Sequence, residues 1–149
     1  MKTKISQSLV GGIVATAVMS VVMMLAAMMG MPKMSPPQML ATMMGVSITV
    51  GWIMHFMIGI IFALSYAYLF INAVRKINSK ILKGAIFGIA AFIFAQIAMA
   101  VLGAMIGGLP PLEGSVALIM TGSIMGHIVF GIVVALFVKP ETSNENVKN

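Results

Sequence analysis

The chain alternates between long apolar stretches and short segments that hold its charges. Four stretches contain no Asp, Glu, Lys or Arg, over residues 9–30, 46–74, 84–112 and 114–138. Each is longer than the roughly 20 residues that an α-helix needs to cross about 30 Å of hydrocarbon. Polar and apolar residues do not alternate within them, as they would in the strands of a membrane barrel. The pattern therefore predicts four transmembrane helices, at about residues 8–30, 46–73, 82–107 and 115–138.

A shorter helix is predicted between the first two spans, at about residues 36–44. Ser35 is a good N-cap, Pro36 suits the first helical position, and Gln38 completes a capping box. Gly45 stands where the helix would end. Because its leucine and methionines gather on one side, we expect this helix to lie in the headgroup region at the outer surface of the membrane.

Composition agrees with a membrane protein. Hydrophobic residues make up 60% of the chain, charged residues make up 8%, and the mean hydropathy is +1.10. These values exclude an ordinary soluble domain of this length. The chain has no cysteine, which excludes disulfides and thiolate metal sites. The expected fold is all-α, with one transmembrane domain over residues 1–139 and a polar, disordered tail over 140–149.

Basic residues mark one side of the predicted bundle. Of the nine Lys and Arg residues, all but Lys33 precede the first span, lie between the second and third, or follow the fourth. The positive-inside rule therefore places both termini in the cytoplasm and the chain in the cell (inner) membrane. The middle cluster is predicted to contact anionic lipid headgroups, and it consists of Arg75, Lys76, Lys80 and Lys83. These few cations lack interleaved aromatic residues, so no nucleic-acid partner is expected.

The chain contains an internal repeat. A shift of 72 residues superposes six residues on identical ones, namely Thr49, His55, Gly59, Ile60, Ala63 and Leu64. A shift of 73 residues places Gly11 on Gly84 in the preceding helices. Each unit is a helix pair that returns to its starting side, so duplication predicts a four-helix bundle of two parallel hairpin repeats.

Two histidines occupy equivalent places in this repeat. Titratable rings are rare within apolar spans, so His55 and His127 are the chain's best candidates for a functional site. Each is flanked one helical turn away by small residues, which are Gly51 and Gly59 for the first histidine and Ser123 and Gly131 for the second. Small-residue rows mark packed helix faces, so both rings are expected to point into the bundle at similar depth.

Three hypotheses account for the histidines. In the first, each ring only packs and donates a hydrogen bond to a carbonyl or to a polar neighbour such as Gln96, Thr16 or Ser20. In the second, His55 and His127 together bind the iron of haem b, or copper, with the adjacent glycines leaving space for a flat ring. In the third, they relay protons in a small transporter or channel. The sequence leaves all three open.

The remaining residues offer little chemistry. The chain has 17 methionines, but most lie in its first half, which favours adaptable packing over a symmetric copper site. Only three acidic residues occur, none within a predicted span, so we expect no catalysis. The aromatic residues Trp52, Tyr66 and Tyr68 are predicted to anchor the second span at the membrane interfaces.

Three local motifs occur along the chain, at residues 11–20 (GGIVATAVMS), 51–59 (GWIMHFMIG) and 126–131 (GHIVFG). In these motifs the sequence resembles a family of small, uncharacterised prokaryotic membrane proteins of about four helices, known only as a domain of unknown function. The resemblance implies the fold and the membrane location, and it implies no activity.

These observations predict a small, non-catalytic membrane protein. Its size and its lack of extramembrane domains favour an accessory subunit of a larger membrane complex, such as a membrane oxidase or monooxygenase. The expected partners are membrane lipids and either other membrane subunits or further copies of the chain itself.

Overall fold

The computed structural model describes residues 2–109 and 114–139, and every regular element in that part of the chain is helical. The elements are α1 (Lys2–Met28), α2 (Pro36–Met44), α3 (Ile48–Ser65), η1 (Tyr66–Phe70), α4 (Ile71–Ala73), α5 (Lys80–Ile106) and α6 (Val116–Phe137). The segment η1 is one turn of π-helix that continues α3 into α4. The predicted disordered tail, 140–149, lies outside the described residues.

Four helices are long and apolar enough to cross a membrane: α1, α5, α6 and the continuous helix from α3 to α4. The all-helical prediction is therefore confirmed, and these lengths indicate a membrane protein. The first helix begins at Lys2 instead of near residue 8. Its polar first turns are held at the end of α6, because the Lys139 N–H donates to Gln7 Oε1 at 3.0 Å.

The short helix α2 coincides with its predicted range. The Ser35 hydroxyl accepts from the Gln38 N–H at 3.4 Å, and Gly45 ends the helix with a positive φ of 64°. Its apolar side packs on α3, with Leu40 and Met43 buried. Leu40 and Met43 therefore face α3 and not the headgroup region, because α3 offers the small Gly51 as a docking place for the α2 backbone, whereas Met44 stays exposed.

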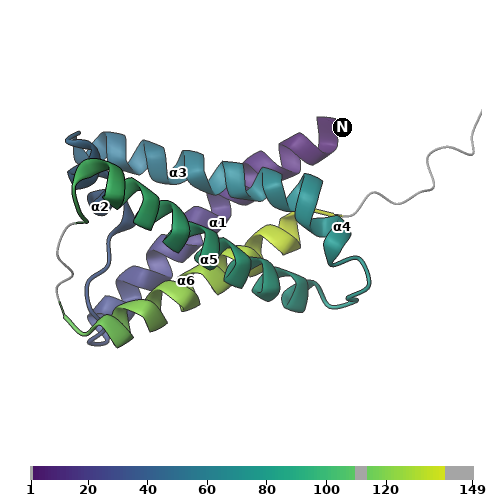
Figure 1. Cartoon of the computed structure of the whole chain (residues 1–149). Coiled ribbons are helices and arrows are strands. Elements are labelled where there is room, and N and C mark those ends of the chain that lie inside the picture. Colours follow the sequence, from purple (N-terminus) through teal and green to yellow (C-terminus); the bar gives the residue numbers. More distant parts are fainter. Residues whose placement is uncertain (1, 110–113, 140–149) are drawn as a thin grey trace, which may run out of the picture.

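The long helices pack as two hairpins joined through α1 and α6 (Figure 1). In the first hairpin, α1 meets α3 where Gly12 lies against the backbone of Ile60. In the second, α5 meets α6 where Gly84 lies against the backbone of Ile132. Small residues at both crossings let the helix backbones approach closely, which is a common way for membrane helices to associate.

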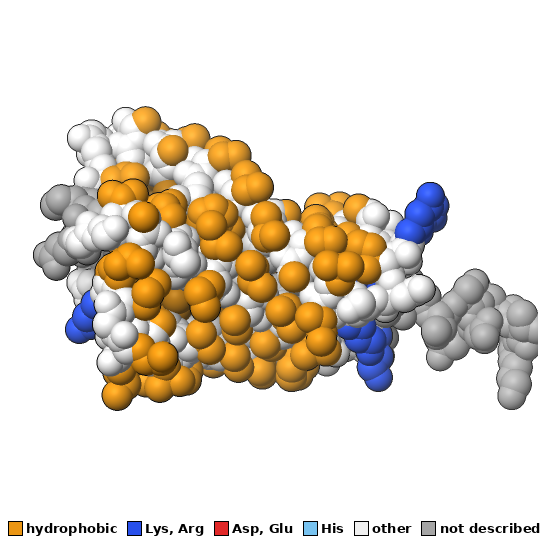
Figure 2. Space-filling view, turned by 90° about the horizontal axis from the view of Figure 1, so that it is seen from below, with side chains coloured by type: hydrophobic (Ala, Val, Ile, Leu, Met, Phe, Trp, Pro, Cys, Tyr) orange, Lys and Arg blue, Asp and Glu red, His pale blue; other side chains and the backbone are white. Residues whose placement is uncertain are grey.

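Charged side chains stand at the two ends of the molecule. In Figure 2, Lys and Arg side chains flank a broad hydrophobic belt. We call the end that carries residues 75–83 the basic end. The end of α6 lies at this same end, because Val138 lines one hollow with Lys80 and Lys83, and the bond between Lys139 and Gln7 brings the start of α1 there too. Lys33 belongs to the connection at the opposite end, between α1 and α2.

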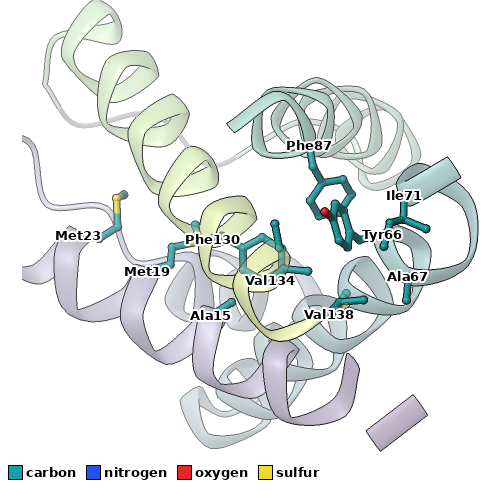
Figure 3. Packing of buried hydrophobic residues seen from close by; sticks show 12 residues of the cluster. Ala15, Met19, Met23, Tyr66, Ala67, Ile71, Phe87, Phe130, Val134 and Val138 are labelled. Atoms are coloured by element: carbon teal, nitrogen blue, oxygen red, sulfur yellow. The ribbon is translucent and has the colours of Figure 1, made fainter. Parts of the chain in front are cut away.

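All four long helices contribute to the buried core, which extends from Ile71 and Val138 near the basic end to Met23 in the far half of α1 (Figure 3). Aromatic rings link α3 and η1 to α5, with centroids 5.7 Å apart for Phe62 and Phe94 and 4.9 Å apart for Tyr66 and Phe87. Beyond these rings α5 packs mainly on α6 and makes only sparse contact with α3. The bundle is therefore closed at the basic end and more open between α3 and α5 toward the other.

Candidate functional site

His55 lies on the packed face of α3. It is 8% exposed, and the buried residues of this helix are Gly51, His55, Gly59 and Ala63, one turn apart. Its Nε2 lies 3.4 Å from the Ser20 hydroxyl oxygen of α1. That hydroxyl donates its only hydrogen to the Thr16 carbonyl at 2.8 Å, so it can only accept from the ring. A neutral His55 ring therefore carries its proton on Nε2 and leaves Nδ1 with a lone pair.

His127 is half-buried on α6 and has the opposite arrangement. Its Nδ1 lies 2.8 Å from the Ser123 carbonyl oxygen, one turn earlier on the same helix. A carbonyl accepts and cannot donate, so a neutral ring carries its proton on Nδ1. The edge of the ring meets Phe92 of α5, with centroids 5.7 Å apart. The Nε2 atom is left with the lone pair.

The two rings lie in different surroundings. His55 contacts Ser20 of α1 and the rings of Trp52 and Phe56, whereas His127 contacts its own helix and α5. Within the described residues, His55 Nδ1 and His127 Nε2 have no hydrogen-bond partner, and neither atom is fully enclosed by protein. Each ring therefore presents one unused nitrogen lone pair.

The predicted supporting glycines hold the helices together and leave no open space. A Cβ atom added at Gly51 would meet the Pro37 carbonyl, one at Gly59 would meet the Thr16 hydroxyl, and one at Gly131 would meet Gly84 and Gly88. The expectation that these glycines clear room for a flat ring is not met. Neighbouring backbone and side chains already fill that volume, as close helix contact requires.

The other two predicted supporting residues differ, because Ser123 contacts a histidine and Gln96 does not. The amide of Gln96 donates to the Met120 sulfur at 3.3 Å, and no hydrogen bond joins it to a histidine within the described residues. Ser123 holds His127 through its backbone carbonyl, so its side chain is not the partner. Among the described residues, no group of three or more His, Cys, Asp or Glu side chains could hold a metal ion. Any metal here would rest on imidazoles alone or on softer ligands.

Sequence reasoning missed a second packed face on α6. Gly122 and Gly126 are buried one turn apart and face methionines of α1 and the following connection. The Met23 sulfur would lie 3.0 Å from a Cβ atom at Gly126, and the Met34 methyl 3.2 Å from one at Gly122. The Gly-xxx-Gly spacing of these two residues is the sequence signal of this face, which lies one residue from the histidine row.

The basic cluster divides into two kinds of position. Arg75, Lys76 and Lys80 are exposed, whereas Lys83 is half-buried against the bundle. Tyr66, expected to anchor the span at the membrane surface, is only 1% exposed. That expectation is wrong because Tyr66 lies three residues after Ala63, on the packed face of the helix, where its ring meets Phe87.

Comparison with known proteins gives a family and no activity. A family model described as "Family of unknown function (DUF6789)" matches residues 2–147, nearly the whole chain. No curated protein and no solved structure matches the chain.

Proposed function

This chain belongs to the DUF6789 family of unknown function, and we propose that it is a non-catalytic accessory subunit of a larger complex in the cell membrane. Its partner is a transmembrane helix of another membrane protein, which fills the open side between α3 and α5. The observation that carries this proposal is the uncovered face that α5 turns toward α3.

That face follows from helical spacing. Phe87, Phe94, Val101 and Met105 recur at intervals of seven and four residues, so they form one row along α5. The row is covered at Phe87 by Tyr66, but Phe94 is 61%, Val101 56% and Met105 78% exposed. In the repeat, α5 corresponds to α1 and α3 to α6, so the contact of α5 with α3 corresponds to that of α1 with α6. The contact of α1 with α6 is extensive. A bundle of two equivalent hairpins therefore lacks one of its expected interfaces, and a partner helix would complete it.

The close contacts at the two hairpin crossings support the repeat architecture. Gly12 against Ile60 and Gly84 against Ile132 are offset by 72 residues on both sides of the contact. Gly59 against Thr16 and Gly131 against Gly88 have the same offset. A single offset of 72 pairs Gly12 with Gly84, so it replaces the offset of 73 inferred for these helices from sequence. We propose that both termini and the basic end face the cytoplasm, as the positive-inside rule requires.

Site-directed photo-cross-linking in native membranes tests the subunit proposal. A benzophenone side chain at Val101 lies on the open face, whereas one at Ala100 is equally deep but about 100° away around the helix. We expect Val101 to yield a product of one fixed mass and Ala100 to yield none. The mass distinguishes another protein from a second copy of this chain. Equal cross-linking at both positions, or lipid adducts alone, would overturn the proposal.

A second candidate function is favoured by the two unused imidazole nitrogens. His55 and His127 are each fixed by a hydrogen bond at one nitrogen, which is how metal-binding histidines are commonly oriented. Imidazole suits copper, and two neutral rings in an apolar setting suit its monovalent form. Copper is preferred over haem b here because the glycines beside the rings leave no space for a macrocycle.

Metal analysis of the purified protein tests the copper site. We expect stoichiometric copper after loading under reducing conditions, lost in both His55→Gln and His127→Gln. Glutamine keeps a hydrogen-bond donor at each position, so the fold should survive. Gln96→Leu is the control and should bind as the unchanged protein does. A metal-free preparation, or copper retained by both histidine variants, would eliminate this function and leave the subunit role standing.

A further inference from the structure

A small hollow opens at the basic end, between the π-helical turn η1, the start of α5 and the end of α6. Its volume is about 160 Å³. Four polar side chains line it, Tyr66, Asn78, Lys80 and Lys83, and Ala135 and Val138 of α6 form an apolar wall. One water molecule occupies about 30 Å³ in the liquid, so the hollow has room for one small polyatomic ion or headgroup.

Tyr66 points into this hollow from the protein interior. Its side chain is 1% exposed and packs on Phe70 and Phe87, with ring centroids 6.2 and 4.9 Å away. Figure 3 shows the tyrosine ring beside Phe87, with its oxygen drawn in red. No hydrogen bond joins this hydroxyl to any described residue, and the oxygen is not sealed off by protein. A buried tyrosine normally finds a hydrogen-bond partner, and a group bound in the hollow would supply one.

Helical spacing places Tyr66 on the packed face of α3, three residues after the buried Ala63. The Ile71 N–H bonds to the Tyr66 carbonyl, five residues back, so one extra residue enters the turn. This insertion shifts the helix register after Tyr66 and brings Ile71 inward, so that both residues border the hollow. Single π-helical turns within longer helices occur frequently at functional sites.

The surroundings of the hollow favour an anion. Lys80 and Lys83 supply two positive charges, and α5 begins at Lys80, so the positive end of the helix dipole borders the hollow. Asn78 adds an amide donor. The described residues include no Asp or Glu, so no protein carboxylate among them competes for these donors. Ammonium, amide and phenol groups together suit the oxygens of a phosphate.

We propose that this hollow binds a phosphate group, with Lys80, Lys83 and the Tyr66 hydroxyl as its ligands. The phosphate comes either from the headgroup of an anionic phospholipid, whose chains would continue along the hydrophobic belt, or from free phosphate. This site is separate from the histidines and from the open face of α5, so its test does not depend on the proposed subunit role.

The test compares variants that differ only at the hollow. Tyr66→Phe removes one unpartnered hydroxyl and keeps the ring, and Lys83→Gln removes one lining charge. Lys76→Gln is the matched control, because it removes an equal charge from the same connection but does not line the hollow. Native mass spectrometry of the detergent-purified chain, titrated with phosphatidylglycerol or phosphatidylcholine, measures lipid retention. Thermal unfolding with and without millimolar inorganic phosphate measures the binding of free phosphate.

We expect preferential retention of phosphatidylglycerol that falls about tenfold in Lys83→Gln and about fivefold in Tyr66→Phe, the usual weights of a charged and a neutral hydrogen bond. Lys76→Gln removes only an exposed headgroup contact outside the hollow, so it should lower retention by no more than about twofold. Stabilisation by inorganic phosphate that depends on the same two residues would support the site and identify free phosphate as its ligand. Equal losses of phosphatidylglycerol retention in Lys76→Gln and Lys83→Gln would overturn the proposal. So would the absence of both a preference for phosphatidylglycerol over phosphatidylcholine and a stabilisation by inorganic phosphate.

Discussion

At the scale of single residues, the space beside each glycine decides what it does. Gly131 is enclosed by the backbones of Gly84 and Gly88, which cannot move without separating two helices. Gly122, on the same helix, faces only the flexible ends of Met31 and Met34. These two glycines lie in equally apolar sequence, but an added side chain should lower the free energy of unfolding more at Gly131 than at Gly122.

Substitution by alanine should separate these two positions. Gly131→Ala forces α5 away from α6, and we expect it to lower the free energy of unfolding by about 1–3 kcal/mol, the usual cost of overpacking. Gly122→Ala should change it by no more than about 0.5 kcal/mol, because methionine side chains can move aside. Thermal unfolding in one detergent measures both. Comparable losses at the two positions would show that the crossing of α5 and α6 is not as close as described.

The two histidines should also differ in their protonated nitrogen. We expect nitrogen-15 NMR of the imidazoles to show an Nε2–H ring for His55 and an Nδ1–H ring for His127, as their partners require. Ser20→Ala removes the acceptor of His55 and should alter only that ring. Ser123→Ala leaves the backbone carbonyl in place and should alter neither. The same tautomer in both rings would contradict these assignments.

The sequence predicted His55 and its row of small residues well, because spacing of four reveals a packed face directly. It predicted α6 less well, since Gly122 and Gly126 form a second row one residue from the histidine row. Spacing alone does not say which neighbour each row meets. The burial of Ile71 was beyond prediction, because no Gly or Pro marks the π-helical turn that brings it inward.

At the scale of elements, the ends of helices and the short segments depend on tertiary contacts more than the spans do. The spans follow from apolar length alone. By contrast, the capping residues of α2 can be recognised in the sequence, but the position of this helix depends on the contact between the Pro37 carbonyl and Gly51 of α3. The apolar side of α2 is thus a packing surface that is specified by a single small residue on a neighbouring helix.

Enlarging that residue should release α2. A Cβ atom in Gly51→Ala would overlap the Pro37 carbonyl and also press on Ala41, at 3.0 Å. We expect backbone hydrogen exchange across residues 36–44 to rise by about tenfold, corresponding to roughly 1.4 kcal/mol of lost protection. Val50→Ala, on the adjacent and partly exposed position, is the control and should leave exchange in α2 unchanged. Unchanged exchange in Gly51→Ala would mean that α2 is held by other contacts.

At the scale of the whole molecule, the distribution of charge and the arrangement of helices give one consistent orientation. The start of α1, the connection between α4 and α5, and the end of α6 share the basic end, as an even number of spans requires. The phosphate-binding hollow lies at this end and the open face of α5 extends away from it. Their positions relative to the cell therefore depend on which side the basic end faces.

Single-cysteine variants can show which side of the membrane the basic end faces, because the chain has no cysteine of its own. Lys33→Cys and Lys76→Cys place exposed thiols at opposite ends of the bundle. We expect a membrane-impermeant maleimide to label Lys33→Cys in intact cells and to label Lys76→Cys only after permeabilisation. Labelling of both variants in intact cells would contradict the claim that the helix from α3 to α4 crosses the membrane between these two positions. The reverse pattern would place the basic end outside, where the hollow would meet external phosphate and outer-leaflet lipids instead of the anionic cytoplasmic leaflet.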